Sequence, residues 1–268
     1  MQHSPALPLQ PIPVSDFIDA VSDAEILAWA DPDDNDGDGI SGVPNWISLK
    51  QYVKERPNSV TQNGRYMGRF GKKAATYDLL QQTATAYNQD IGITSSFEPV
   101  DTHSGLVFDP EVSNQTINDV VFYLKALKAP EPRPESNSIE GKQLFTTIGC
   151  SKCHRPEMKT GNSSIAAIAN KAFYPYSDFL LHDMGSSLDD GYTEGSAKTY
   201  EWRTPPLWGV GLSKKSQGGQ YFLLYDGRAR SIEEAIFLHG GEGIQSLSNY
   251  EALTADEKTK LIKFLESL

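Results

Sequence analysis

The sequence of 268 residues predicts a mainly α-helical protein with long loops. Three observations carry this prediction. Apolar residues recur at helical spacing in several stretches, and most of these begin with a helix-capping pattern. Strict alternation of apolar and polar residues, which is typical of half-buried strands, is scarce. Stretches rich in glycine, proline and aspartate separate the helical ones and indicate long connections.

The composition limits the classes of partner. The net charge is −11 and the isoelectric point is about 4.9. We expect no nucleic-acid partner because such partners require a basic face, and long-range attraction favours a basic protein partner instead. No run of about 18 apolar residues is present, so we expect no membrane span. The first residues, Met1-Gln-His-Ser-Pro5, lack the basic and apolar parts of a signal peptide.

We expect residues 1–130 to form a loop-rich helical region. Prolines at positions 5, 8, 11 and 13 predict an extended arm. The capping box Ser22-Asp-Ala-Glu25 predicts a short helix. A longer helix is expected to end at Gly92, and Ser113 is expected to cap another.

An acidic Asp/Gly loop spans residues 31–42. Its carboxylates at Asp34, Asp36 and Asp38, followed by a glycine, match the first half of an EF-hand calcium loop. The twelfth loop position is Asn45, where an EF-hand has a bidentate glutamate, so we do not expect an ordinary EF-hand. Two readings stay open: a calcium loop of another type, and a solvated acidic turn.

Residues 129–136 are rich in proline and charge and predict a boundary before a second region, 131–268. The capping box Asn137-Ser-Ile-Glu140 predicts a helix in which Gly141 would allow a close helix crossing. The capping box Thr254-Ala-Asp-Glu257 predicts an amphipathic C-terminal helix.

The motif Cys150-Ser-Lys-Cys153-His154 contains the only two cysteines of the chain. Its Cys-x-x-Cys-His pattern predicts covalent attachment of one haem c through two thioether bonds, with His154 as the proximal iron ligand. A disulfide or a redox dithiol is the alternative, but neither requires a histidine after the second cysteine. A helix leading into this motif and a C-terminal helix crossing it form the layout of a cytochrome c-like domain.

Several longer motifs resemble those of the di-haem oxidoreductases, which are similar to the bacterial cytochrome c peroxidases. The motifs are Tyr174-Pro-Tyr-Ser-Asp178, Leu181-His-Asp-Met-Gly185, Glu201-Trp-Arg-Thr-Pro-Pro-Leu-Trp-Gly209, Asp226-Gly-Arg-Ala-Arg230 and His239-Gly-Gly-Glu242. The resemblance implies two haem-binding motifs, but this chain contains only the one at 150–154. The missing motif would lie upstream of residue 1. It also implies that peroxide reacts at the upstream haem while the haem of this chain relays electrons.

The sixth iron ligand has two leading candidates. A helix capped at Ser231 would carry His239 on its apolar face, and in the similar peroxidases a distal methionine stands at the corresponding distance from the helix start. Met184 is the alternative, since a thioether suits haem iron. His182, Met158 and His103 are weaker candidates, and His182 could bond to a haem propionate instead.

Other side chains are expected to contact the haem. Arg203, Arg228 and Arg230 could bind its propionates, although the last two could pair locally with acidic neighbours. Trp202 is expected to pack on the haem edge.

We therefore expect the electron-transfer part of a di-haem peroxidase-like oxidoreductase. The alternative is a stand-alone mono-haem c-type cytochrome that carries electrons. Expected partners are an upstream haem domain and a redox protein, and covalent haem attachment predicts an extracytoplasmic, for instance periplasmic, location. A calcium-structured interaction module is a third reading. Thiol chemistry is not expected, because thioether bonds consume both thiols.

Overall fold

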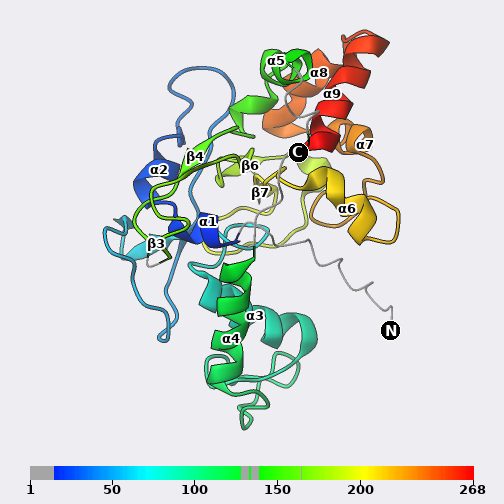
Figure 1. Cartoon of the computed structure of the whole chain (residues 1–268). Helices are drawn as coiled ribbons and strands as arrows, with labels where there is room; N and C mark the ends of the chain where they lie inside the picture. Colours follow the sequence, from blue (N-terminus) through cyan, green and yellow to red (C-terminus); the bar gives the residue numbers. More distant parts are fainter. Residues whose placement is uncertain (1–14, 128–132, 134–138, 164) are drawn as a thin grey trace.

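The computed structural model describes residues 15–127, 133, 139–163 and 165–268 (Figure 1). The expected N-terminal arm, most of the expected boundary at 129–136 and the expected cap at Asn137 lie outside the described residues.

The expectation of a mainly α-helical class is wrong. Helices account for 36% and strands for 12% of the described structure, and the strands form three small antiparallel sheets. One sheet has the order β1-β3-β2, from Trp46–Ile47, Arg65–Met67 and Thr61–Gln62. The other two are β4–β5, from Met158–Lys159 and Ala172–Phe173, and β6–β7, from Leu181–Asp183 and Glu201–Arg203. Strands of two or three residues are too short to show the alternation that reveals a strand in sequence.

Two helices of the first half, α2 and α4, begin where their caps predict. The four helices described there are α1 (Ser15–Ala20), α2 (Asp23–Leu27), α3 (Leu79–Ile91) and α4 (Asn114–Ala126). The Ser22 and Ser113 side chains accept hydrogen bonds from the backbone N–H groups of Glu25 and Thr116. Gly92 ends α3 in the left-handed conformation, with φ of 71°. Helices α3 and α4 form a lobe at one end of the molecule (Figure 1).

The helices of the second half gather at the opposite end of the molecule (Figure 1). The α-helices are α5 (Ile139–Thr147), α6 (Val210–Ser216), α7 (Ile232–Phe237), α8 (Ile244–Glu251) and α9 (Ala255–Ser267). Three short 3₁₀ turns accompany them: η2 (Cys150–Lys152), η3 (Ser186–Leu188) and η4 (Gly241–Gly243). The capping box at Thr254 is confirmed, since both of its hydrogen bonds are present.

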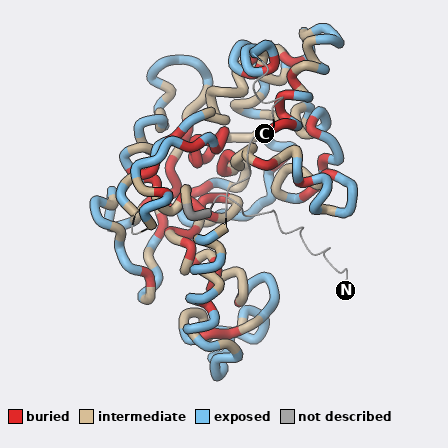
Figure 2. The backbone as a smooth tube through the Cα atoms, in the orientation of Figure 1, coloured by how far each residue is buried: buried red, intermediate tan, exposed pale blue. Residues whose placement is uncertain are grey.

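Two apolar clusters make up most of the buried core. Figure 2 shows where the buried residues lie along the backbone. The first joins residues from both sides of the 129–136 stretch, including Ile26, Leu79, Met158 and Phe179. The second is built from residues beyond 144 and centres on the crossing of α5 and α9. Within the part of the chain that the structure describes, no helix combines the length and the apolar character needed to cross a membrane.

Candidate functional site

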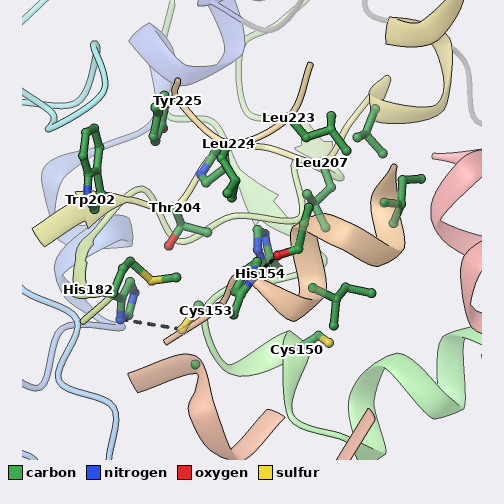
Figure 3. Close-up of a pocket in the computed structure, with 18 of the residues that line it drawn as sticks. Cys150, Cys153, His154, His182, Trp202, Thr204, Leu207, Leu223, Leu224 and Tyr225 are labelled. Carbon is green, nitrogen blue, oxygen red and sulfur yellow. Dashed lines mark hydrogen bonds between the residues drawn. The ribbon is translucent and has the colours of Figure 1, made fainter. Parts of the chain in front are cut away.

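A cavity of about 320 Å³ borders the second apolar cluster (Figure 3). Three stretches that are far apart in sequence supply most of its wall: 149–154, 202–210 and 222–243. Leu207, Leu223 and Leu224 face it across from the two cysteines. A largely apolar wall with a few polar groups is typical of a site for a large hydrophobic ligand.

The Cys-x-x-Cys-His motif forms a short 3₁₀ turn at the edge of this cavity. Gly149 precedes the turn with φ of 99°, a conformation that favours glycine, and the His154 N–H donates to the Cys150 carbonyl at 2.9 Å. Both thiols are unpaired and line the cavity. Burial raises the pKa of Cys150 to about 12 and also raises that of Cys153, so the free thiols are protonated at neutral pH.

His154 and His239 face the same cavity from different elements. The α7 helix ends at Phe237, so His239 lies just beyond the helix that was expected to contain it. The Nδ1 of His154 donates to the Tyr176 carbonyl at 2.9 Å, and that of His239 donates to the Ala235 carbonyl at 2.7 Å. Because a carbonyl oxygen only accepts, Nδ1 carries the proton in each ring, and Nε2 keeps its lone pair.

Burial keeps both rings neutral. It lowers the pKa of His154 to about 4, with a further contribution from His239, and it lowers the pKa of His239. The ring centres are 6.5 Å apart. Two imidazoles that share one metal ion through bonds of about 2.0–2.1 Å hold their ring centres roughly 6–6.5 Å apart. The two histidines and the two thiols therefore fit a covalently attached haem whose iron has two imidazole ligands.

Met184, the alternative sixth ligand, also lines the cavity, directly after β6. His182 does not suit the ligand role. Its Nε2 donates to Asp178 at 2.9 Å and its Nδ1 donates to Glu242 at 2.6 Å, so neither nitrogen has a free lone pair. The Cys153 sulfur lies 3.6 Å from the same Nδ1 (Figure 3).

The expected haem-contacting side chains fall into two groups. Trp202, Arg203 and Arg228 line the cavity. The Trp202 ring stacks on Tyr225 with centroids 5.6 Å apart, while Arg203 and Arg228 donate to backbone carbonyls. Arg228 also pairs with Asp226, as one reading of the sequence anticipated.

Arg230 stands apart from the cavity wall. Its guanidinium lies over the Phe222 ring, 4.0 Å from the centroid. Ala229, between the two arginines, pairs with Leu223 in an isolated antiparallel bridge.

A buried charged network was missed by the sequence reasoning. His182 and Asp178 are 3% and 1% exposed, and with Glu242 they form a carboxylate–imidazole–carboxylate row. Burial alone would lower the pKa of His182, but the Asp178 charge and the hydrogen bond to it outweigh burial and raise the pKa well above its usual value. The ring is therefore a cation that the two carboxylates neutralise.

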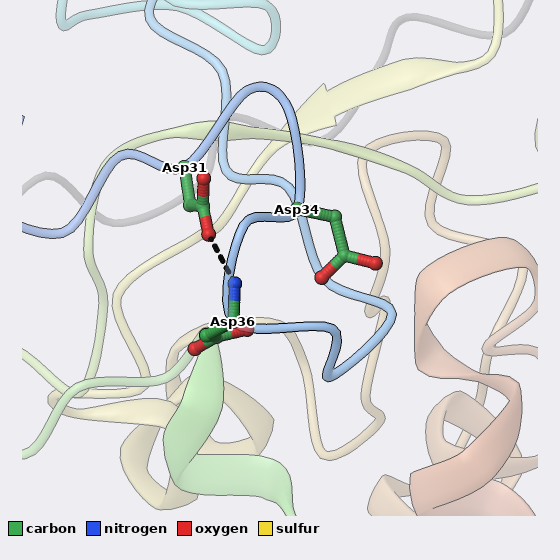
Figure 4. A group of neighbouring side chains, drawn as sticks. All are labelled: Asp31, Asp34 and Asp36. Atoms are coloured by element: carbon green, nitrogen blue, oxygen red, sulfur yellow. Dashed lines mark hydrogen bonds between the residues drawn. The ribbon is translucent and has the colours of Figure 1, made fainter.

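The acidic loop presents a different carboxylate set from the expected one. Asp31, Asp34 and Asp36 bring one carboxylate oxygen each within 4.8 Å of one another (Figure 4). Asp38, expected in this set, instead forms an ion pair of 3.0 Å with Lys152, which lies between the two cysteines. Asp31 was missed because it precedes the alternating aspartates, and the turn at 31–36 brings it back.

One comparison with known proteins agrees with a haem site. A family model described as "Di-haem oxidoreductase, putative peroxidase" matches residues 9–268. No curated protein matches this chain. A solved hydrazine synthase of Kuenenia stuttgartiensis, pressurised with xenon, is similar at 18% identity and a TM-score of 0.37. That similarity covers 63% of this chain and 59% of the synthase chain, and we draw nothing about function from so distant a likeness.

Proposed function

This chain belongs to the di-haem oxidoreductase family, and on that basis we propose that it is the electron-transfer part of a peroxidase-like enzyme. The proposal depends on one observation above all. Two neutral imidazoles, His154 and His239, lie 6.5 Å apart in a cavity that also holds two free thiols.

Each group of the site has a proposed task. Cys150 and Cys153 would each add their S–H across one vinyl group of the macrocycle, which forms two thioether bonds without a leaving group. His154 and His239 would both hold the iron. The haem would supply a one-electron redox couple. If both histidines were iron ligands, they would leave no position for a substrate on the iron, and the site would suit electron transfer.

The remaining cavity residues would orient and shield the group. Arg203 and Arg228 carry the positive charges on the wall that propionates require, and Trp202 adds an aromatic face. The surrounding apolar side chains exclude water, which stabilises a buried redox centre against side reactions. Arg230 has no task in this proposal.

The proposed enzyme also includes parts outside this chain. We propose that peroxide reacts at a second haem domain, upstream in the same protein, and that a basic redox protein exchanges electrons with this acidic chain. Covalent haem attachment supports an extracytoplasmic location. A stand-alone mono-haem electron carrier is the second candidate, and it is favoured by the single Cys-x-x-Cys-His motif.

The ligand assignment is tested by spectroscopy of His239→Ala beside Met184→Ala. We expect the wild-type protein to carry one covalent haem that is low-spin and six-coordinate, with no peroxide turnover by this chain alone. His239→Ala should become high-spin, because one axial ligand is removed, while Met184→Ala should keep the low-spin absorption and EPR spectra.

If Met184→Ala became high-spin and His239→Ala stayed low-spin, Met184 would be the sixth iron ligand instead of His239. That arrangement also predicts a higher reduction potential than two imidazoles give, which a redox titration measures. Peroxide turnover by the wild-type chain would contradict the relay role.

We also propose calcium as the ion of the acidic loop, at Asp31, Asp34 and Asp36. Oxygen ligands suit this hard cation, and three neighbouring carboxylates repel one another without one. Asp38 is not included, because Lys152 already neutralises it.

A further inference from the structure

Glu242 connects three separate segments next to the cavity. Its carboxylate accepts four hydrogen bonds and donates none. They come from the Ser41 hydroxyl at 2.6 Å, the Ser41 N–H at 3.2 Å, the His182 Nδ1 at 2.6 Å and the Asp183 N–H at 3.3 Å. Ser41 lies near the end of the acidic loop, and His182 and Asp183 belong to β6. The turn that follows His239 is thereby fixed to two elements far away in sequence.

The network continues to the haem-attachment motif. Asp178 accepts from the far side of the His182 ring at 2.9 Å, and its own N–H donates to the Cys153 carbonyl at 3.0 Å. The path from Glu242 to the motif is therefore made entirely of hydrogen bonds between buried or half-buried groups. A row of this kind fixes orientation, because each group can satisfy its partners in one arrangement only.

The backbone of the turn at 240–241 also packs closely against the backbone of residues 183–185. A Cβ atom at Gly241 would lie 2.2 Å from the Asp183 carbonyl oxygen, and one at Gly240 would lie 2.8 Å from the Met184 oxygen. On the other side, a Cβ at Gly185 would lie 2.9 Å from the Gly241 nitrogen. The His239–Gly243 segment thus lies directly on the end of β6, and Glu242 holds it there by its side chain.

We propose that Glu242 is a positioning residue for the sixth haem ligand. By fastening the turn at 240–243 to β6, it holds His239 toward the cavity at the distance from His154 that one iron requires. This inference rests on the proposed function, since it takes His239 as a ligand. The competing explanation is that Glu242 only fills space. A substitution that keeps its shape but removes a hydrogen-bond acceptor distinguishes the two roles.

Glu242→Gln makes that separation, because glutamine keeps the shape and loses one acceptor. Each carboxylate oxygen of Glu242 receives two donors, so the amide NH₂ of glutamine would face two donors whichever way it is turned. If Glu242 only fills space, the substitution changes nothing. If its acceptors position the turn, His239 should leave the iron more readily.

The experiment uses the full chain with covalently attached haem, prepared as wild type, Glu242→Gln and the control Glu251→Gln on the exposed part of α8. Cyanide serves as the probe, since it binds only after an axial ligand has left. We expect cyanide binding to the ferric protein to become about tenfold faster or more in Glu242→Gln, with a high-spin EPR signal appearing, because a charged hydrogen-bond acceptor is lost. Glu251→Gln should behave as wild type.

Ser41→Ala provides a second, milder variant that removes one of the four hydrogen bonds and should give a smaller effect in the same direction. Circular dichroism verifies that each variant is folded. Cyanide rates and EPR spectra equal to wild type in both Glu242→Gln and Ser41→Ala would overturn the positioning role. A wild-type protein without covalent haem, or without low-spin iron, would instead refute the proposed function itself.

Discussion

Substitution of Gly141 by alanine should destabilise the protein, because α5 and α9 cross in closest contact at this residue. A Cβ atom there would lie 2.5 Å from the Cβ of Phe264 and 2.9 Å from the Lys260 carbonyl oxygen. Carbon atoms in contact are ordinarily about 3.5–4.0 Å apart, so the overlap exceeds roughly 1 Å. One of the obstructing atoms belongs to the backbone, and Phe264 is fully buried, so neither can move aside freely.

Two effects of opposite sign determine the magnitude. Overpacking of a well-packed interior costs about 1–3 kcal/mol. Alanine is favoured over glycine inside a helix by about 0.8–1.0 kcal/mol, which offsets part of that cost. Because the overlap is large and one obstructing atom is backbone, the cost should lie in the upper part of that range, about 2–3 kcal/mol. We therefore expect the free energy of unfolding to fall by about 1–2 kcal/mol, equivalent to a decrease of roughly 2–8 °C in Tm.

Urea denaturation followed by circular dichroism measures this change. Gln143→Ala on the exposed face of α5 is the matched control, and it should leave the midpoint nearly unchanged. A Gly141→Ala protein as stable as wild type, or more stable, would refute the reasoning, since it would mean that the helices separate at no cost.

Two further predictions concern the body of the protein. Lys73→Met should lower the free energy of unfolding, measured by urea denaturation, by about 2–4 kcal/mol. The buried ammonium donates to three backbone carbonyls, which would lose their partner. The exposed control Lys171→Met should leave the free energy of unfolding nearly unchanged, and an equal decrease in both variants would contradict the reasoning. Calcium should raise the Tm of the wild type by binding only the folded state, and chelation should reverse this. Asp34→Asn should abolish the calcium shift, while its persistence there, or its absence in wild type, would reject the acidic-loop site.

Local patterns located the helices that begin with a capping side chain, but not α6 and α8, which have no side-chain cap. Ser22, Ser113, Ser231 and Thr254 all cap helices as predicted, because a capping side chain bonds to a backbone group only three residues away. The fold class could not be predicted in the same way. The residues that pair with β6 lie in β7, about 20 residues later in the chain. Pairing of such short strands depends on contacts between distant residues, which leave no periodic pattern in the local sequence.

The same distinction between short local patterns and contacts made by folding applies to the candidate site. The motif at 150–154 and the position of His239 could be found in the sequence, since each is marked by a short pattern. The row formed by Asp178, His182 and Glu242 could not, because Glu242 is 60 residues from His182 and each looks like an ordinary polar residue. The motif His239-Gly-Gly-Glu242 did contain a usable signal: two glycines that permit close backbone contact, followed by a carboxylate.

The sequence by itself predicted a haem-attachment motif at 150–154 and located several helix starts, because both depend on residue types at fixed short spacing. The acidic character of the chain follows from its composition alone. The tertiary structure decided which carboxylates meet in the acidic loop, which cavity residues surround the two histidines, and that His182 is tied up between Asp178 and Glu242. Those outcomes depend on the folded path of the chain, since hydrogen bonds and close packing act only over a few ångströms and the residues concerned are brought together only by folding.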